Sequence, residues 1–178
     1  VSFAGFTSEA GRFQDTQRFG LAARSWTDWT PSTVKPQVRC LLTAAFDAAN
    51  RRMIIYAGQR SGALDDLWSF DLASRQWTDL TTTPRPPGRF WSTSFVNKAG
   101  RFMVFGGSGA GNFNDTWEFD GTTWTNRTPA TGNPPARIEH SLTYDSSRNV
   151  TVLYGGTRTN GAGTFEDTWE WNGSAGAK

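Results

Sequence analysis

The sequence has very few of the residues from which common metal and redox sites are built. It contains one cysteine, Cys40, and one histidine, His140, among 178 residues. A single cysteine excludes an internal disulfide, and one cysteine with one histidine cannot form the usual kind of zinc site. A nucleophile would also lack a histidine–acid pair, because His140 would have to serve alone. We therefore expect no metal, no cofactor and no enzymatic activity.

Long apolar runs and concentrated charge are missing as well. No stretch reaches the roughly 18 apolar residues that a membrane-spanning helix needs, so we expect no membrane partner. The formal net charge is +2, which is too small to indicate the dense basic stripe of a nucleic-acid-binding protein. The lone cysteine leaves the cellular compartment open.

Glycine and aromatic residues are plentiful instead. The chain has 19 glycines and nine tryptophans, and only 19% of its residues are charged. A disordered chain would be rich in charge and poor in aromatics. Glycine-rich turns combined with many aromatic residues are typical of an all-β fold made of short strands.

One five-residue block that begins with aspartate and ends with an aromatic residue recurs four times. The aspartates lie 51, 49 and 52 residues apart, and the blocks cover residues 15–19, 66–70, 115–119 and 167–171. Three further blocks keep the same phase. They are an apolar run that ends in two small residues (1–5, 54–58, 103–107 and 152–156), a Trp-Thr block (26–30, 77–81 and 124–128) and a block that opens with arginine (39–47, 89–97 and 137–145).

Each block is short, aromatic or β-branched, and bounded by turn-forming residues, which predicts a strand. All eight prolines fall in the linkers between the Trp-Thr block and the arginine block, as expected if proline avoids strand interiors. The pattern therefore predicts four antiparallel four-stranded units in one domain, roughly at residues 1–33, 34–84, 85–132 and 133–178. The first unit lacks its arginine strand and the last lacks its Trp-Thr strand, which leaves fourteen strands.

An apolar strand that ends in Gly-Gly, followed by an aromatic strand and a tryptophan at a period near 50, resembles the kelch repeat. The galactose-oxidase-like bacterial variety is the most similar. The Gly-Gly pair is intact at Gly106-Gly107 and Gly155-Gly156 and degenerate in the first two copies. The resemblance implies a β-propeller in which the arginine strand of each blade lines the central channel and the Trp-Thr strand is outermost.

The incomplete first and last units leave three interpretations open. The chain is part of a longer propeller, or it assembles with copies of itself into a ring or fibre, or it closes alone as an irregular four-bladed ring. Unpaired sheet edges at the two ends would favour self-association.

The connectivity places the linkers before the arginine strands and the loops after the Gly-Gly pairs on one face. We expect this face to bind an anionic partner, since arginine suits bidentate contacts with carboxylates and acidic sugars. The candidate ligand-binding residues are Arg39, Arg89 and Arg137 at the channel mouth, Trp91 for stacking, and Arg12, Arg60 and Arg158 in the loops. The structural alternative is that the repeated arginines cap strand ends and bind carbonyls of the next blade.

The other repeated residues have simpler interpretations. The six repeated tryptophans are expected to pack between blades: Trp26, Trp68, Trp77, Trp117, Trp124 and Trp169. The four repeated aspartates are expected to cap turns, because one carboxylate per blade does not make a calcium site.

We expect a non-catalytic kelch-type module that binds a protein, through an acidic peptide, or an anionic glycan. Two alternatives are a self-assembling structural repeat protein and a carbohydrate-active enzyme fragment of galactose-oxidase-like ancestry. The second would lack the copper site, since one histidine and three tyrosines cannot supply its ligands, and Glu139 would be its best channel carboxylate.

Overall fold

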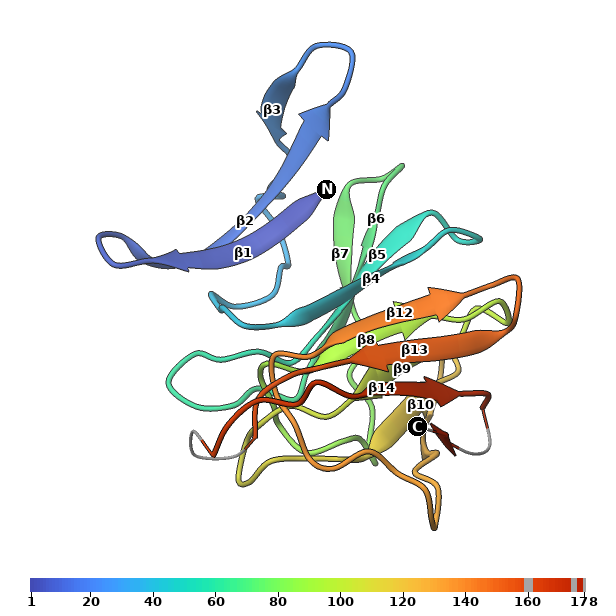
Figure 1. Cartoon of the computed structure of the whole chain (residues 1–178). Helices are drawn as coiled ribbons and strands as arrows, with labels where there is room; N and C mark the ends of the chain where they lie inside the picture. The colour runs from blue at the N-terminus through green and yellow to red at the C-terminus, as the bar shows by residue number, and fades with distance from the viewer. Residues whose placement is uncertain (159–161, 174–175, 178) are drawn as a thin grey trace.

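The protein folds into four antiparallel β-sheets arranged side by side (Figure 1). The computed structural model describes residues 1–158, 162–173 and 176–177. The described residues form strands and loops, with no helix long and apolar enough to cross a membrane. The predicted all-β fold with four antiparallel repeat units is confirmed.

Each sheet follows chain order, so consecutive strands are hydrogen-bonded neighbours. The first sheet consists of β1 (Ser2–Thr7), β2 (Gly11–Gly20) and β3 (Ser25–Asp28). The second consists of β4 (Thr43–Asp47), β5 (Arg52–Tyr56), β6 (Leu67–Asp71) and β7 (Gln76–Asp79). The third consists of β8 (Thr93–Val96), β9 (Phe102–Phe105), β10 (Thr116–Phe119) and β11 (Trp124–Asn126). The fourth consists of β12 (Ser141–Asp145), β13 (Val150–Tyr154), β14 (Thr168–Trp171) and β15 (Gly176–Ala177).

The expectation that the fourth sheet lacks its outer strand is wrong. The two-residue strand β15 pairs with β14, and Gly176 lies opposite Trp171. In the second and third sheets the same register position pairs Trp77 with Phe70 and Trp124 with Phe119. The Trp-Thr signature is absent from β15, so the sequence pattern could not reveal this strand.

The inner strands begin later than predicted. β4, β8 and β12 start four residues after Arg39, Arg89 and Arg137. The strand cannot begin at the arginine because the chain adopts a left-handed conformation two residues later, with φ of 56° at Leu41, Trp91 and Glu139. The inner strands lie next to one another, β4 beside β8 and β8 beside β12, and the first sheet lies at the top of the view, apart from the fourth (Figure 1).

Apolar side chains fill the spaces between neighbouring sheets. Phe3 of the first sheet packs with Ile55, Phe70 and Trp77 of the second. Tyr56 of the second sheet belongs to the same cluster as Phe119 and Trp124 of the third. Two further contacts cross the interfaces. The Trp77 Nε1–H donates to Thr16 Oγ1 at 3.0 Å, and the rings of Tyr56 and Trp124 lie 5.1 Å apart.

Glycine is required where the chain leaving β5, β9 and β13 passes close to the segment before the inner strand of the same repeat. Gly58, Gly107 and Gly156 have φ between 96° and 102°. A β-carbon at these positions would lie 2.9, 2.9 and 2.7 Å from the carbonyl oxygens of Cys40, Phe90 and Ile138. Both the lack of space and the positive φ therefore require glycine at the second position of the Gly-Gly pair. The first position accepts another residue, since Ala57 occupies it with φ of 60°.

His140 is a buried residue at the interface of the third and fourth sheets. Its Nε2 lies 2.5 Å from the Thr93 hydroxyl, and its ring packs edge-on against Phe105 at 5.3 Å. Burial, with a smaller contribution from the charge of Arg137, lowers the pKa of His140 to about 4. The imidazole is therefore neutral in the folded protein near neutral pH.

This burial predicts a loss of stability in mild acid. An unfolded histidine has a pKa of about 6.5, so below that pH the unfolded state binds a proton that the folded state excludes. We expect the free energy of unfolding to fall between about pH 6.5 and pH 4, as measured by urea denaturation. The variant His140→Leu places at this position the residue found at the equivalent Leu42. Its free energy of unfolding should fall much less between about pH 6.5 and pH 5, since the chain has no other histidine. An unchanged slope in that variant would contradict this account.

Candidate functional site

The three repeated arginines are completely buried, with side chains 0% exposed. The guanidinium group of Arg39 makes a two-pronged ion pair with Asp66, and both N–O distances are 2.6 Å. It also donates to the carbonyl oxygens of Ala57 at 2.9 Å and Gln37 at 3.1 Å. All of these partners except Gln37, in the linker, lie in or beside the strands of the same repeat.

The same arrangement recurs in the third and fourth sheets. Arg89 pairs with Asp115 at 2.7 and 3.0 Å, and Arg137 pairs with Asp167 at 2.7 and 3.1 Å. Each aspartate also accepts a hydrogen bond from the indole N–H two residues later, with N–O distances of 2.6 to 2.7 Å. The hydrogen bonds from Arg137 hold the pKa of Asp167 at about 2 despite its partial burial.

The main chain of each arginine joins its sheet to the preceding one. The N–H of Arg89 donates to the Leu64 carbonyl at 2.9 Å, and its own carbonyl accepts from the Gly58 N–H at 2.8 Å. Arg39 and Arg137 make the equivalent bonds to the first and third sheets. In the second, third and fourth sheets, an arginine thus holds the sheet together through its side chain and joins it to the preceding sheet through its backbone.

These contacts correct two sequence-based expectations. Arg39, Arg89 and Arg137 were candidates for ligand binding at the channel mouth, but a fully buried and paired guanidinium presents no free donor to a ligand. The structural alternative, in which the arginines bind backbone carbonyls, agrees better with the observed contacts. The side chains bind within their own repeat, however, and not to the next blade. The repeated aspartates at 66, 115 and 167 pair with arginine instead of capping turns. Each arginine precedes its aspartate by 27, 26 or 30 residues, and this near-constant separation could have indicated the pairing from the sequence.

Leu41, Trp91 and Glu139, the left-handed residues at the entry to the inner strands, occupy the position predicted for the channel mouth, and this region is called the mouth below. Backbone hydrogen bonds link them from sheet to sheet, since the Trp91 N–H donates to the Leu41 carbonyl at 3.1 Å and the Glu139 N–H donates to the Trp91 carbonyl at 3.4 Å. Leu41 and Glu139 are exposed and Trp91 is half-buried, with its ring 4.9 Å from Phe90. The Glu139 carboxylate accepts from the Thr157 hydroxyl at 3.2 Å. The mouth therefore presents leucine, tryptophan and glutamate at equivalent positions of three repeats.

The three loop arginines differ from the buried ones because none of them forms an ion pair with a carboxylate among the described residues. Arg12 donates to Cys40 Sγ and Gln59 Oε1, both at 3.2 Å. Arg60 is exposed and donates to Gln37 Oε1 at 2.7 Å. Arg158 is exposed and lies over the Phe165 ring at 4.3 Å.

Arg60 and Arg158 occupy the same place in the second and fourth sheets, two residues after the close-packed glycine. The third sheet has Gly109 there. The N–H of each of these three residues donates to a glycine carbonyl of its own loop, two residues later at Gly62 and Gly111 and five residues later at Gly163. Trp91 belongs to that third sheet, so its mouth position lies between a repeat that carries Arg60 and a repeat that carries Arg158. The arrangement combines an aromatic ring with two exposed arginines that form no ion pair among the described residues, which suits a ligand that has a flat or apolar part and an acidic group.

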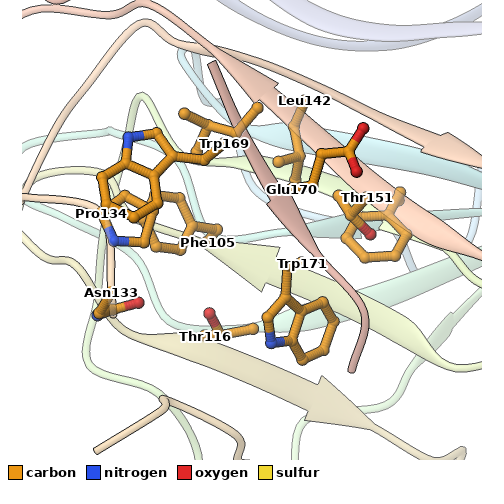
Figure 2. Close-up of a pocket in the computed structure, with 11 residues that line it drawn as sticks. Phe105, Thr116, Asn133, Pro134, Leu142, Thr151, Trp169, Glu170 and Trp171 are labelled. Atoms are coloured by element: carbon orange, nitrogen blue, oxygen red, sulfur yellow. The ribbon is translucent and has the colours of Figure 1, made fainter. Parts of the chain in front are cut away.

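The apolar pocket between the third and fourth sheets is a packing gap rather than a ligand site. Its cavity is about 30 Å³, whereas sites for small molecules are typically about 300–1,000 Å³. Figure 2 shows the indole of Trp171 beside Thr116 in this gap. The equivalent Thr16 accepts a hydrogen bond from Trp77, but the Trp171 Nε1–H has no partner among the described residues.

Five of the six repeated tryptophans are buried or half-buried, as expected for packing residues. Trp26 is 61% exposed, because it lies on the first sheet's face away from the second. In the described part of the chain, no group of three or more His, Cys, Asp or Glu side chains is placed to hold a metal ion.

Comparison with known proteins finds the same repeat. The profile of the KLHDC2/KLHL20/DRC7 Kelch-repeats domain matches residues 1–174. Adagio-like protein 1 of Oryza sativa subsp. japonica is 27% identical over 118 residues, which cover 61% of this chain and 18% of that protein. Putative adagio-like protein 2 of the same organism is 29% identical over 119 residues, which cover 62% and 18%. The chain thus spans about a fifth of the length of these curated relatives.

The buried pairs predict a sharp difference between two arginine variants. Arg89→Ala leaves the Asp115 carboxylate without its partner, which costs about 3–5 kcal/mol of unfolding free energy for a buried pair. Arg60→Ala removes an exposed side chain and should change stability by about 0.5 kcal/mol or less. Urea denaturation of both variants measures the difference. Equal stabilities would show that the pair between Arg89 and Asp115 does not hold the sheet together.

Proposed function

Because the chain belongs to the kelch-repeat family, we propose that it is a non-catalytic protein-interaction module whose mouth face binds an acidic partner. The observation that carries the proposal is the pair of exposed arginines without an ion pair among the described residues, Arg60 and Arg158, in the repeats on either side of Trp91. Like charges around one opening attract an anion because their fields add. The ligand is an acidic peptide segment or an anionic glycan.

Three of the residues contribute in different ways. Trp91 supplies an aromatic face that is already held in place by the Leu41 and Glu139 backbone bonds, so little entropy is lost on binding. Arg60 and Arg158 supply exposed, charged donors. Arg12 is less free, because its Nε and Nη2 are engaged by Cys40 and Gln59, and it contributes mainly to the local charge.

Glu139 restricts which acidic ligands fit. Its exposed carboxylate shares the mouth with Trp91, and an acidic group placed next to it would be repelled. The acidic group of the ligand must therefore lie toward the loops, while the apolar part contacts Trp91 and Leu41. A peptide that alternates acidic and apolar residues meets this requirement better than a uniformly acidic one.

We expect the double variant Arg60→Gln/Arg158→Gln to bind an array of acidic peptides and sulfated glycans about tenfold more weakly than the wild type, since losing two exposed charge contacts costs about 1–2 kcal/mol. Trp91→Ala should weaken binding by a similar factor. The melting temperature of the double variant should change little, because neither arginine is buried.

Arg24→Gln/Arg51→Gln provides the matched control. It removes the same number of exposed charges from turns that the strand direction places on the opposite face. If the control weakens binding as much as the test variant, the interaction is a general charge effect and the mouth is not the site.

A second candidate function is self-assembly through the outward faces of the first and fourth sheets. Trp26 and Tyr154 are 61% and 56% exposed, whereas the equivalent Trp77, Trp124 and Tyr56 are buried between sheets. A second copy could cover both faces in the way that the internal sheets cover one another.

Sedimentation velocity over a hundredfold range of protein concentration tests self-assembly. Assembly predicts a sedimentation coefficient that rises with concentration in the wild type. The rise should be smaller in Trp26→Ser, which removes the exposed indole. A coefficient that stays constant and corresponds to the 19.6 kDa monomer would exclude this function.

A further inference from the structure

One tryptophan at the interface of the first and second sheets is contacted by two arginines. The Cζ atom of Arg18, in β2, lies 5.3 Å from the centroid of the Trp29 ring, and the Cζ atom of Arg75, in the turn between β6 and β7, lies 4.6 Å from it. The Trp29 ring also packs against the core cluster that contains Phe70 and Trp77. The core therefore holds an indole that orients guanidinium groups from two different sheets.

Both guanidinium groups are left without a polar partner in the part of the chain that the structure describes. Arg18 and Arg75 are exposed, and neither side chain forms an ion pair or donates a hydrogen bond there. Two neighbouring carboxylates bind their own turns instead. Asp28 accepts from the N–H two residues later at 2.8 Å, and Asp71 accepts from the N–H and the hydroxyl of Ser74 at 2.6 and 2.8 Å.

The equivalent positions of the third sheet carry an ion pair. Glu118 stands where the first sheet has Arg18, and Arg127 stands where it has Trp29. The Arg127 Nη2 lies 2.9 Å from the Glu118 carboxylate. The repeat can therefore neutralise a cation at this place, and the first sheet carries a cation in place of the carboxylate that would do so.

We propose that Arg18 and Arg75 bind a phosphate monoester group on a partner protein, such as the side chain of phosphoserine, at a site separate from the mouth. A phosphate monoester carries a charge of about −1.5 to −2 and three strong acceptor oxygens, which match the planar forks of two guanidinium groups. A guanidinium that lies over a ring uses its face, so the N–H groups at its edge stay free for the ligand. The two cations that share one indole repel each other, and a dianion between them relieves that repulsion.

The contacts of Trp29 favour a phosphorylated protein segment over a nucleic acid. Single strands bind along a basic groove and stack their bases on open aromatic faces. The Trp29 ring is instead occupied by Arg18, by Arg75 and by the core around Phe70. Two arginines around one ring match one phosphate group and not a row of phosphates.

A labelled peptide of glycine and alanine with one central phosphoserine provides the probe, and fluorescence anisotropy measures its binding to the 178-residue protein. It should bind at least about tenfold more tightly than the same peptide with serine or glutamate, because only the phosphate satisfies both arginines. The variant Arg18→Gln/Arg75→Gln should bind it at least about tenfold more weakly than the wild type.

Two further variants separate a specific site from a general charge effect. Lys98→Gln/Arg101→Gln removes the same number of cations from the turn between β8 and β9 of the third sheet, and binding should not change. Arg18→Lys/Arg75→Lys keeps both charges but loses the planar forks, so affinity should still fall several-fold. Circular dichroism of each variant confirms that it is folded.

Four results would overturn the proposal. The first is equal affinity for the phosphoserine and glutamate peptides, and the second is unchanged binding to Arg18→Gln/Arg75→Gln. The third is loss of binding to Arg60→Gln/Arg158→Gln, which would place the peptide at the mouth. The fourth is tighter binding of an oligothymidine than of the phosphopeptide, lost in Arg18→Gln/Arg75→Gln, which would assign the site to nucleic acid.

Discussion

The buried ion pair between arginine and aspartate is the interaction on which the rest of the structure depends. Arg89 illustrates its role, since one guanidinium group satisfies the Asp115 carboxylate and the carbonyls of Gly106 and Pro87. A buried charge is tolerable only when it is paired and hydrogen-bonded in this way. Because the backbone of the same residue bonds to the preceding sheet, a substitution that displaces this arginine would disturb its own sheet and the contact with the preceding sheet together.

The arrangement of strands could be predicted from the sequence because the repeat has several independent signals. The phase of the aspartates, the Gly-Gly pairs and the confinement of proline to linkers all place the strands in the same way. The short strand β15 was missed because Gly176 stands where Trp77 and Trp124 stand in other repeats. A two-residue strand made of glycine and alanine leaves no side-chain pattern to detect.

The candidate site was predicted only in part, for a physical reason. Position along a repeat indicates at which end of a sheet a residue lies, but it does not indicate whether a long side chain turns inward. Arg39, Arg89 and Arg137 turn inward because an aspartate lies 26 to 30 residues later in the same sheet. Arg60 and Arg158 have no such carboxylate and remain exposed. A search for charge pairs at a fixed separation would have distinguished the two groups.

The row of left-handed residues allows the binding preference of such a protein to change without a change of its backbone. Leu41, Trp91 and Glu139 share one backbone conformation, and the bonds that hold them come from main-chain atoms. The scaffold therefore accepts an apolar, an aromatic and an acidic side chain at the same position of successive repeats. Each repeat contributes one interchangeable side chain to the mouth, so binding preference can diverge residue by residue while the buried arginines keep the framework constant.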